Sequence, residues 1–321
     1  MLQQSTAVHN RRGKMERLEE NTIEFLNTLC HNSGCVISDS GGKDSSVLKV
    51  VAMKAHEKYG MNFKIRHNHT TVDAPETVYF VREEKKRFEA MGIEYEISYP
   101  KETMWQLIVR HCTPPTRLMR YCCAELKEGS GFGEKLVTGV RRSESKNRKE
   151  NQGIVTFTKP KKSLKEKIEE NEDFVETKKG GIIVYNLDND ENRRIVESCY
   201  RTHKTLINPL LNWDDDFLWW YIRKENITLN PLYGCGQNRV GCIGCPMAGL
   251  HRWKEFERYP KYKEAYIRAF DRMLRERERR GLKNGEKWAT GLKVFKWWME
   301  DKSIDGQYTF DMDGNIREEY T

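Results

Sequence analysis

Short apolar runs alternate with amphipathic segments between Cys35 and Thr138. The apolar runs, which predict strands, are 35–38, 63–67, 93–98 and 135–138. Residues 45–59 repeat apolar side chains at helical spacing, and a second such segment follows Pro75 and ends at Gly92. Strands separated by helices are joined by right-handed crossovers. The pattern therefore predicts an α/β fold built on a doubly wound parallel sheet.

Residues 141–195 break this alternation. They are rich in lysine and acidic residues, and Gly180-Gly181 precedes a short apolar run at 182–185. Such a segment is typical of a mobile, solvent-exposed insertion with one small hairpin. A solvated surface excursion is the simplest interpretation, and a lid or a nucleic-acid contact stays open as the alternative.

The C-terminal third is rich in aromatic residues and predicts two helices. One follows the acidic triplet 214–216, which supplies a helix N-cap. The other repeats apolar residues at three-four spacing from Tyr262 to Leu274. One face of that helix is expected to pack on a core, while the opposite face is basic.

The charge composition of the chain predicts the kind of surface that it presents. The 321 residues carry a net charge of +8, with 32% charged and 37% hydrophobic residues. This balance predicts a modest core under a charged surface suited to polyanions such as nucleic acid. No stretch approaches the roughly 20 apolar residues of a membrane span, and residues 1–20 lack the pattern of a signal peptide. We therefore expect a cytoplasmic protein with no membrane association.

The strongest motif is the hexapeptide Ser40-Gly41-Gly42-Lys43-Asp44-Ser45, between the first predicted strand and the first predicted helix. Two glycines let backbone N–H groups approach an anion, Lys43 adds positive charge, and the helix directs its positive dipole end at the same place. The spacing excludes a Walker A loop. The hexapeptide resembles the pyrophosphate loop (PP-loop) of the adenine nucleotide alpha hydrolase superfamily.

That resemblance implies a nucleotide site and a reaction type. In the superfamily the loop holds the β and γ phosphates of ATP, and reaction occurs at the α phosphate with pyrophosphate as leaving group. The implied chemistry is adenylation. Ser40, Gly41, Gly42, Lys43, Asp44 and Ser45 would line the site, and Asp44 would reach a magnesium ion.

Further segments, in the same order, resemble the phosphoadenosine phosphosulfate reductase family. They are 73–77 (DAPET), 121–127 (YCCAELK), 138–145 (TGVRRSES) with Arg148, 208–210 (NPL) with Trp213, and 230–233 (NPLY). The resemblance covers about residues 22–260. It implies that Arg141, Arg142 and Arg148 meet phosphate or sulfate. It also implies that Asp73 and Gly139 belong to the nucleotide site.

One departure from the family separates this chain from true sulfonucleotide reductases. Those enzymes attack sulfur with a cysteine in a C-terminal Cys-Gly-Leu-His motif, whereas the last cysteine here is Cys245, far from the final residue Thr321. The chain is more similar to the family's sulfurtransferases of DNA phosphorothioation, which pair the same loop with a cysteine-bound iron–sulfur cluster.

Nine cysteines, an odd number with no export signal, favour reduced thiols over a disulfide framework. The five clustered ones are Cys122, Cys123, Cys235, Cys242 and Cys245. Four thiolates suit either zinc or a 4Fe-4S cluster. The Cys-Pro dipeptide 245–246 and the adjacent pair Cys122-Cys123, as in cluster-bearing relatives, favour the 4Fe-4S cluster.

The five thiols exceed the four ligand places, and the resemblance offers two ligand sets. Cluster-bearing reductases imply Cys122, Cys123, Cys242 and Cys245, whereas the phosphorothioation enzymes imply that Cys235 replaces one of the first pair. The remaining thiol, with Cys122 as one candidate, would carry persulfide sulfur. Cys199 is a weaker candidate ligand, and Cys30, Cys35 and Cys112 are expected to be buried or incidental.

The resulting hypothesis is an ATP-dependent sulfurtransferase that activates nucleic acid for sulfur insertion, with DNA favoured over tRNA. The catalytic residues would be Lys43, Asp44, Arg141, Arg142 and Cys122, with ATP, Mg2+ and a 4Fe-4S cluster as cofactors. A cysteine desulfurase would donate sulfur, and a homo-oligomer or multi-protein complex stays open. The alternatives are a sulfonucleotide reductase that uses an internal thiol, a tRNA thiolation enzyme, and a non-enzymatic nucleotide- and cluster-binding subunit.

The shifts in pattern also predict how the chain is divided. The expected segments are a polar N-terminal arm (1–21), a PP-loop nucleotide-binding domain (22–150), a charged insertion (151–196), a cysteine-rich cluster-binding region (197–250) and a basic helical region (251–321).

Overall fold

The computed structural model describes the chain except residues 1, 129–132, 159–161, 169–170, 178–179, 186–190, 193, 197–203, 301–308, 311–315 and 318–321. The chain forms two compact units, each assembled from separate stretches. The first unit comprises Met1–His69, Ala74–Tyr99 and Gly129–Gly241, and the second comprises Thr70–Asp73, Pro100–Glu128 and Cys242–Thr321. Among the helices of the described residues, none combines the length and the apolar composition that a membrane span requires.

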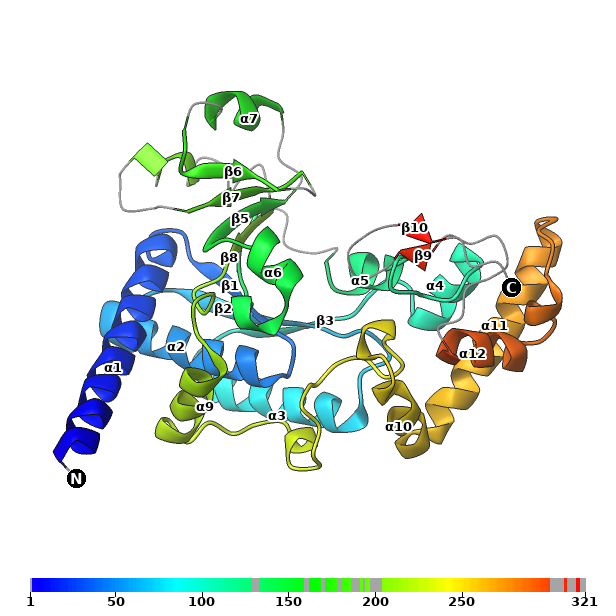
Figure 1. Cartoon of the computed structure of the whole chain (residues 1–321), viewed down its shortest axis with the longest axis horizontal. Helices are drawn as coiled ribbons and strands as arrows, with labels where there is room; N and C mark the ends of the chain where they lie inside the picture. Colours follow the sequence, from blue (N-terminus) through cyan, green and yellow to red (C-terminus); the bar gives the residue numbers. More distant parts are fainter. Residues whose placement is uncertain are drawn as a thin grey trace. The chain divides into compact units, whose positions relative to one another are not determined.

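An eight-stranded sheet in the order β3-β2-β1-β4-β8-β5-β7-β6 forms the centre of the first unit. Its strands are β1 (Cys35–Asp39), β2 (Phe63–Asn68), β3 (Tyr95–Ser98), β4 (Lys135–Val137), β5 (Val155–Thr158), β6 (Phe174–Glu176), β7 (Ile182–Val184) and β8 (Lys204–Ile207). The five strands from β3 to β8 in this order are parallel, and β5, β7 and β6 continue the sheet antiparallel (Figure 1). The predicted α/β fold class is confirmed.

Helices surround this sheet and close its core. They are α1 (Leu2–Cys30), α2 (Lys43–Tyr59), α3 (Pro75–Ala90), α6 (Lys146–Asn151), α7 (Lys162–Ile168) and α9 (Asp215–Lys224), with the short 3-10 turns η1 (Arg142–Glu144) and η2 (Pro231–Tyr233). The apolar stripe of α2, which includes Val47, Leu48 and Val51, is fully buried in that core. Asp214 caps α9 by accepting a hydrogen bond from the Phe217 N–H, as the acidic triplet predicted.

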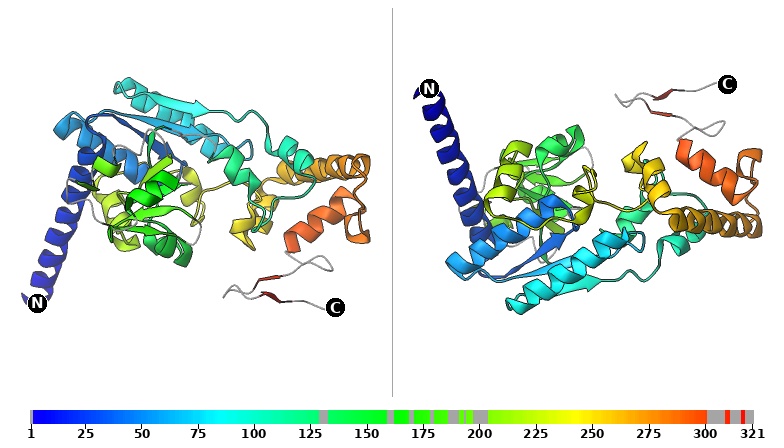
Figure 2. Two further views of the ribbon diagram at one scale, coloured as in Figure 1. Left: turned by 90° about the horizontal axis from the view of Figure 1, so that it is seen from above. Right: turned by 90° about the horizontal axis from the view of Figure 1, so that it is seen from below.

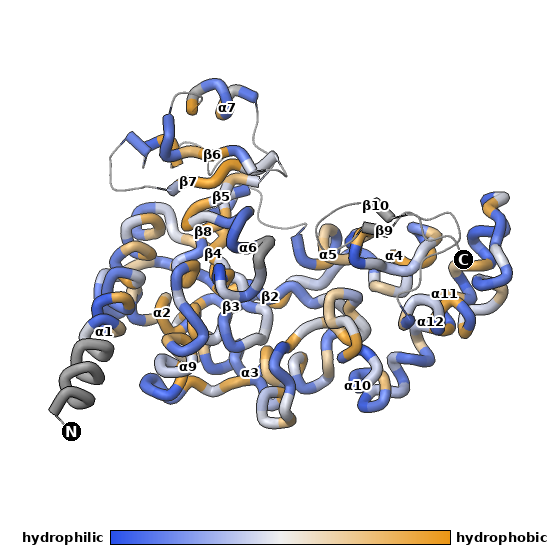
Figure 3. Tube along the Cα trace, in the orientation of Figure 1, coloured by the Kyte–Doolittle hydropathy of each residue, from blue (hydrophilic) through white to orange (hydrophobic). Residues whose placement is uncertain are grey.

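The segment predicted as a solvent-exposed insertion is instead part of the main sheet. Its strands β5, β7 and β6 bury Phe157, Ile182 and Val184, and Figure 3 shows these strands as a hydrophobic patch within the sheet. The predicted hairpin does exist, as β6 and β7, with Gly180 at a φ of 74° beside the turn. The strands are short, so their apolar signal is diluted by the charged residues between them.

The predicted polar arm is helical from Leu2 onward, because α1 runs without a break from Leu2 to Cys30. Ile23, Leu26 and Leu29 on its C-terminal half are buried in the core of the first unit. The structure thus places no boundary near residue 21.

The second unit is mainly helical. It contains α4 (Met104–His111), α5 (Tyr121–Leu126), α10 (His251–Arg258), α11 (Pro260–Arg279) and α12 (Gly291–Glu300), the turns η3 (Pro246–Ala248) and η4 (Glu286–Trp288), and the two-stranded sheet β9 (Thr309–Phe310) and β10 (Ile316–Arg317). Helix α11 buries Tyr266, Phe270 and Met273, as the three-four spacing predicted. It packs along α12, as both views in Figure 2 show.

The division into units differs from the predicted segments. The expected cysteine-rich region 197–250 is split after Gly241, and residues 100–128, expected within the nucleotide-binding domain, belong to the second unit. Contacts distant in sequence decide this division, because a compact unit collects every segment that shares its core.

Candidate functional site

The PP-loop joins β1 to α2 in the first unit. Gly42 is the N-cap of α2, so the loop meets the positive end of the helix dipole. Gly41 has a φ of 70°, and a Cβ added there would lie 2.9 Å from the Thr77 Cγ2 atom. Both the backbone conformation and the close approach of α3 therefore require glycine at position 41.

Two residues of the distant segment 230–233 form hydrogen bonds with the backbone of the loop. The Lys43 N–H donates to the Tyr233 hydroxyl at 2.9 Å, and the Asn230 side-chain amide donates to the Gly41 carbonyl at 3.2 Å. Burial raises the pKa of Tyr233, so its phenol stays protonated near neutral pH. In the sequence these residues stood out only as part of a family motif, because nothing local links them to a loop in the distant N-terminal part of the chain.

Asp44 lies between two cations at the start of α2. Its Oδ1 accepts a 2.6 Å hydrogen bond from the Arg141 Nε, and its Oδ2 lies 3.1 Å from the Lys43 Nζ. Arg141 is almost fully buried and also binds Asp215 Oδ1 at 2.8 Å. Each carboxylate oxygen keeps a second lone-pair site, so Asp44 retains the capacity to bind a cation such as Mg2+.

The other predicted phosphate residues are placed differently. Gly139, just after β4, packs so tightly that an added Cβ would lie 3.0 Å from the backbone of Asp44. Arg142 donates to the Asn212 side chain at 3.1 Å, and Arg148 pairs with Glu144. Of the contacts described for the three predicted arginines, the one made by Arg141 reaches the PP-loop, through its hydrogen bond to Asp44.

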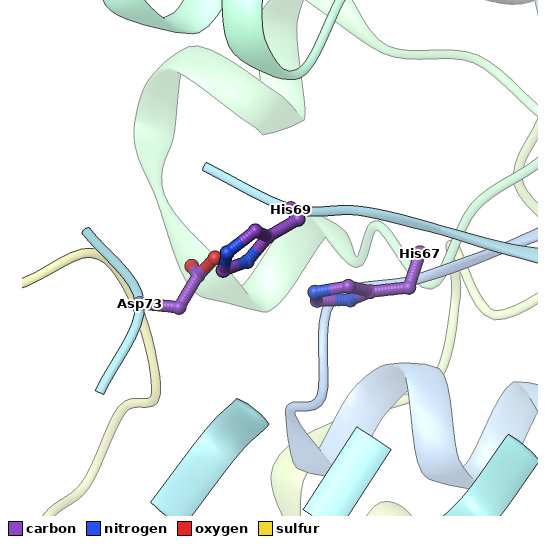
Figure 4. A group of neighbouring side chains, drawn as sticks. All are labelled: His67, His69 and Asp73. Carbon is purple, nitrogen blue, oxygen red and sulfur yellow. The ribbon is translucent and has the colours of Figure 1, made fainter. Parts of the chain in front are cut away.

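Asp73 was predicted in the nucleotide site, but it belongs to the second unit. Its carboxylate accepts hydrogen bonds of 2.7 Å from both the N–H and the hydroxyl of Thr70. Figure 4 shows it with His67, at the end of β2, and His69. The His67 Nδ1 lies 2.9 Å from the Asp39 carbonyl oxygen. Because the histidines belong to the first unit, we assign no shared site to the three residues.

Four of the five clustered cysteines line one pocket of the second unit. The pocket is lined by Thr70, Met104, Pro115, Cys122, Cys123, Leu126, Lys127, Cys242, Gly244, Cys245, Pro246 and Tyr266. Cys235 belongs to the first unit and is exposed. The structure thus assembles the ligand set implied by the cluster-bearing reductases. Cys199 lies outside the described residues, and Cys30, Cys35 and Cys112 are buried, as expected.

The turn that presents Cys242 and Cys245 is fixed by close packing. Gly244 has a φ of 74°, and an added Cβ would lie 2.6 Å from the Phe256 ring. The Gly244 N–H donates to the Glu255 carboxylate at 2.8 Å, and the Tyr266 hydroxyl donates to the Ile243 carbonyl at 3.0 Å. The two thiols of the C-x-x-C motif are therefore held on a rigid turn.

Cations lie beside the thiols of this pocket. The thiol of Cys122, which hydrogen bonds to Cys123, and the Arg120 guanidinium, 3.5 Å from the Cys123 Sγ, lower the pKa of Cys123 to about 5. Burial raises the pKa of Cys242, whereas negative charge on Cys242 and Asp73 raises the pKa of Lys127. Cations beside thiolates stabilise the form that binds metals.

The spacing of the sulfurs tests which metal group fits. A tetrahedral zinc ion with Zn–S distances of about 2.3 Å holds its sulfurs about 3.8 Å apart. Within the described part of the chain, no three cysteine sulfurs lie within 4.8 Å of one another. The four thiols are therefore not arranged as a preformed tetrahedral zinc site, whereas a 4Fe-4S cluster binds each thiolate on a separate iron. A set of four cysteine donors is one that such a cluster accepts.

This division of the cysteines gives a first prediction. Replacing Cys235 by serine is expected to leave the iron and sulfide content of anaerobically purified protein within about 20% of wild type, because a 4Fe-4S cluster needs only four thiolates. Iron and acid-labile sulfide assays measure the outcome. Loss of half or more of the iron would instead support the set in which Cys235 is a ligand.

An α/β fold with a PP-loop at the start of α2 defines the class of this protein. Residues 34–248 match the phosphoadenosine phosphosulfate reductase domain. The chain belongs to that family.

Two uncharacterized proteins of Methanocaldococcus jannaschii are similar to this chain. One is 24% identical over 281 residues, which cover 86% of this chain and 49% of the relative. The other is 24% identical over 247 residues, which cover 73% of this chain and 48% of the relative. The chain spans about half the length of the curated relatives that it matches.

Several solved structures match the fold of this chain at low sequence identity. Phosphoadenylyl-sulfate reductase from Candida auris has a TM-score of 0.42 at 15% identity, over 71% of this chain and 93% of that chain. The U34-tRNA thiolase NcsA from Methanococcus maripaludis, solved with its [4Fe-4S] cluster, has a TM-score of 0.40 at 13% identity, over 87% and 88% of the two chains. FMN adenylyltransferase from Candida glabrata has a TM-score of 0.38 at 14% identity, over 72% of this chain and 62% of that chain.

Proposed function

We propose that the protein is an ATP-dependent, adenylating iron–sulfur sulfurtransferase that activates nucleic acid for sulfur insertion, with DNA phosphorothioate modification as the favoured reaction. The observation that carries this proposal is that one chain holds both a PP-loop and a pocket lined by four cysteine thiols. The first unit would activate the substrate, and the second would handle sulfur.

The PP-loop would perform the first step. The β and γ phosphates of ATP would bind at the N-terminus of α2, where Lys43 adds a positive charge. Asp44 would bind Mg2+ together with phosphate oxygens. A phosphate oxygen of the substrate would then attack the α phosphorus, and pyrophosphate would leave.

Sulfur handling would belong to the cysteine pocket. Cys122, Cys123, Cys242 and Cys245 would hold the 4Fe-4S cluster, which supplies a sulfur- and electron-handling centre when bound. Arg120 and Lys127 would offset the negative charge of the thiolates. A cysteine desulfurase would supply sulfur as a cysteine persulfide, whose outer sulfur would attack the activated phosphorus as AMP leaves. A dithiol reductant would then cleave the remaining S–S bond, which frees the phosphorothioate and restores the carrier cysteine. Cys235, an exposed thiol outside the pocket, is a candidate carrier for that sulfur.

The distribution of charge supports a polyanionic substrate. Residues 251–300 hold 15 basic and eight acidic residues, a net charge of +7. Exposed cations of this stretch include Lys254, Lys261, Arg272, Arg275 and Lys293. Cations that neutralise phosphates supply most of the affinity of a protein for nucleic acid. The same chemistry would serve tRNA, which is the second candidate substrate.

A sulfonucleotide reductase is the alternative function. Membership of the phosphoadenosine phosphosulfate reductase family favours it, as does the assembled set of four cysteines. Cys235, which is exposed in the unit that carries the PP-loop, would be a candidate for its nucleophilic thiol. Sulfite released from a sulfated nucleotide would be its product.

Pyrophosphate release separates these functions. Anaerobically purified protein is incubated with ATP and Mg2+, with and without a desulfurase, cysteine and either DNA or tRNA. We expect release of pyrophosphate that depends on the nucleic acid, with DNA more effective than tRNA. A parallel incubation with a sulfated nucleotide tests the reductase, which would release sulfite without releasing pyrophosphate from ATP. The absence of both products would support a non-enzymatic binding subunit.

A further inference from the structure

A buried ionic network lies directly behind the PP-loop. The Lys49 Nζ donates to Asp39 Oδ2 at 2.6 Å and to Glu84 Oε2 at 2.8 Å. Lys49 is fully buried, and Asp39 and Glu84 are 3% and 4% exposed. The Tyr95 hydroxyl donates to the same Asp39 Oδ2 at 2.5 Å. One oxygen of the Asp39 carboxylate is thus held by a cation and a phenol.

The other oxygen of Asp39 holds the loop itself. Oδ1 accepts hydrogen bonds of 2.8 Å from the Gly41 N–H and from the Ser45 hydroxyl. These two donors lie near the two ends of the hexapeptide. A carboxylate has about four lone-pair sites, and Asp39 uses all four. Because Lys49 and Tyr95 fix Oδ2, the orientation of the whole carboxylate is fixed. Oδ1 in turn fixes the Gly41 N–H and the Ser45 hydroxyl, which donate to it.

The charges of this network balance. Glu84 also accepts a 3.0 Å hydrogen bond from Arg87, so two carboxylates face two cations. Burial raises the pKa of Asp39, but the charges of Lys49 and His67 and the hydrogen bonds from Lys49 and Tyr95 outweigh burial and hold that pKa well below its usual range. Asp39 is therefore ionised at neutral pH without adding net negative charge behind an anion site.

A contribution to folding stability does not by itself explain why these buried ion pairs are present. Apolar residues of similar volume often replace buried ion pairs at no loss of stability, because the desolvation of both charges offsets their attraction. A fixed carboxylate does what apolar side chains cannot do: it accepts from a backbone N–H and a hydroxyl at defined positions. Such fixed positions are what preorganised anion sites require.

We propose that Asp39 is a positioning residue of the PP-loop. Held by Lys49 and Tyr95, it fixes the Gly41 N–H and the Ser45 hydroxyl, so that the loop has its anion-binding shape before the nucleotide arrives. The Gly41 N–H is thereby bound to the Asp39 carboxylate at 2.8 Å. This role rests on the proposed nucleotide site, but it is a property of the free protein and is testable there.

Two variants test the proposal from opposite ends of the network. Asp39→Asn removes the charge and presents N–H donors to Lys49 and Tyr95, and we expect it to weaken ATP binding by about tenfold or more, since hydrogen bonds to charged groups are involved. Tyr95→Phe removes one anchor far from the loop, and we expect about threefold weaker binding. Isothermal titration with ATP and Mg2+ gives the affinities.

A matched control and a second readout separate positioning from folding. Tyr221, on α9, is as deeply buried as Tyr95, and Tyr221→Phe is expected to bind ATP as wild type does. Hydrogen exchange of the peptide that spans residues 40–46, without nucleotide, should be about threefold to tenfold faster in Asp39→Asn and Tyr95→Phe only. Unchanged exchange and unchanged affinity in the folded variants would overturn the proposal.

The two possible failures are distinguishable. If wild-type protein does not bind ATP, the proposed function fails, while the exchange rates in the free protein still decide the role of Asp39. If Asp39→Asn does not fold, Tyr95→Phe decides it, because that variant leaves Lys49 paired with both carboxylates.

Discussion

Replacing Asp44 by asparagine is expected to lower the rate of pyrophosphate release from ATP by about 100-fold to 1000-fold, the cost of losing one essential charged group in an active site. Asp44 binds the Arg141 Nε at 2.6 Å and the Lys43 Nζ at 3.1 Å, and it is the candidate ligand for Mg2+. Asparagine keeps the size and one acceptor oxygen. It loses the charge that draws Mg2+ and that orients both cations.

The matched control for this prediction is Asp215→Asn. Asp215 binds the same arginine at 2.8 Å, but its side chain is 63% exposed and it lies on α9, outside the loop. Exposed ion pairs contribute about 0–1 kcal/mol, so we expect at most about a fivefold change in rate. A wild-type rate in Asp44→Asn would contradict the role of Asp44, and an equally large loss in both variants would instead make Arg141 the residue that matters.

Replacing Cys242 by serine is expected to remove the iron–sulfur cluster and abolish sulfur transfer, while pyrophosphate release stays within about twofold of wild type. Cys242 lines the pocket, and its Sγ lies 3.4 Å from the Thr70 hydroxyl. Serine is nearly isosteric, but a neutral hydroxyl does not replace a thiolate ligand, and iron content should fall to less than about one tenth. Iron and sulfide assays and product analysis measure the two effects.

Cys112→Ser is the control, because Cys112 is also buried in the second unit and does not line the pocket. Its Sγ donates to the Val109 carbonyl at 3.4 Å, a hydrogen bond that serine can keep. We expect unchanged iron content. Full iron in Cys242→Ser would remove the cluster from the proposal, and zinc in place of iron in the wild type would do the same.

Local patterns predicted the PP-loop and the parallel strands β1 to β4, but not the parallel strand β8. Val36 and Ile37 before the double glycine, and the helical spacing of Val47, Leu48 and Val51 after it, define a strand, a tight turn and a buried helix within one short stretch of chain. Such signals need no information from the rest of the chain. They also predicted the position of an anion site, because glycine, lysine and a helix N-terminus are adjacent there.

The prediction missed strand β5 and the place of the hairpin β6–β7 in the main sheet, for a physical reason. A strand of three residues such as 182–184 has too few positions to establish a period, and its pairing partners are distant in sequence. What stabilises it is burial against neighbouring strands, so the same apolar run reads as a surface hairpin when considered alone.

Sequence patterns alone predicted the α/β class, the PP-loop and the group of cysteines proposed to hold a metal. The folded structure was needed to show that Cys235 belongs to a different unit from the other four, and that Asp39, Asn230 and Tyr233 hold the loop. The reason is that spacing along a chain limits only neighbours. A carboxylate becomes a positioning group when folding removes it from water and places Lys49 and Tyr95 against it, and those contacts join segments 10 and 56 residues away.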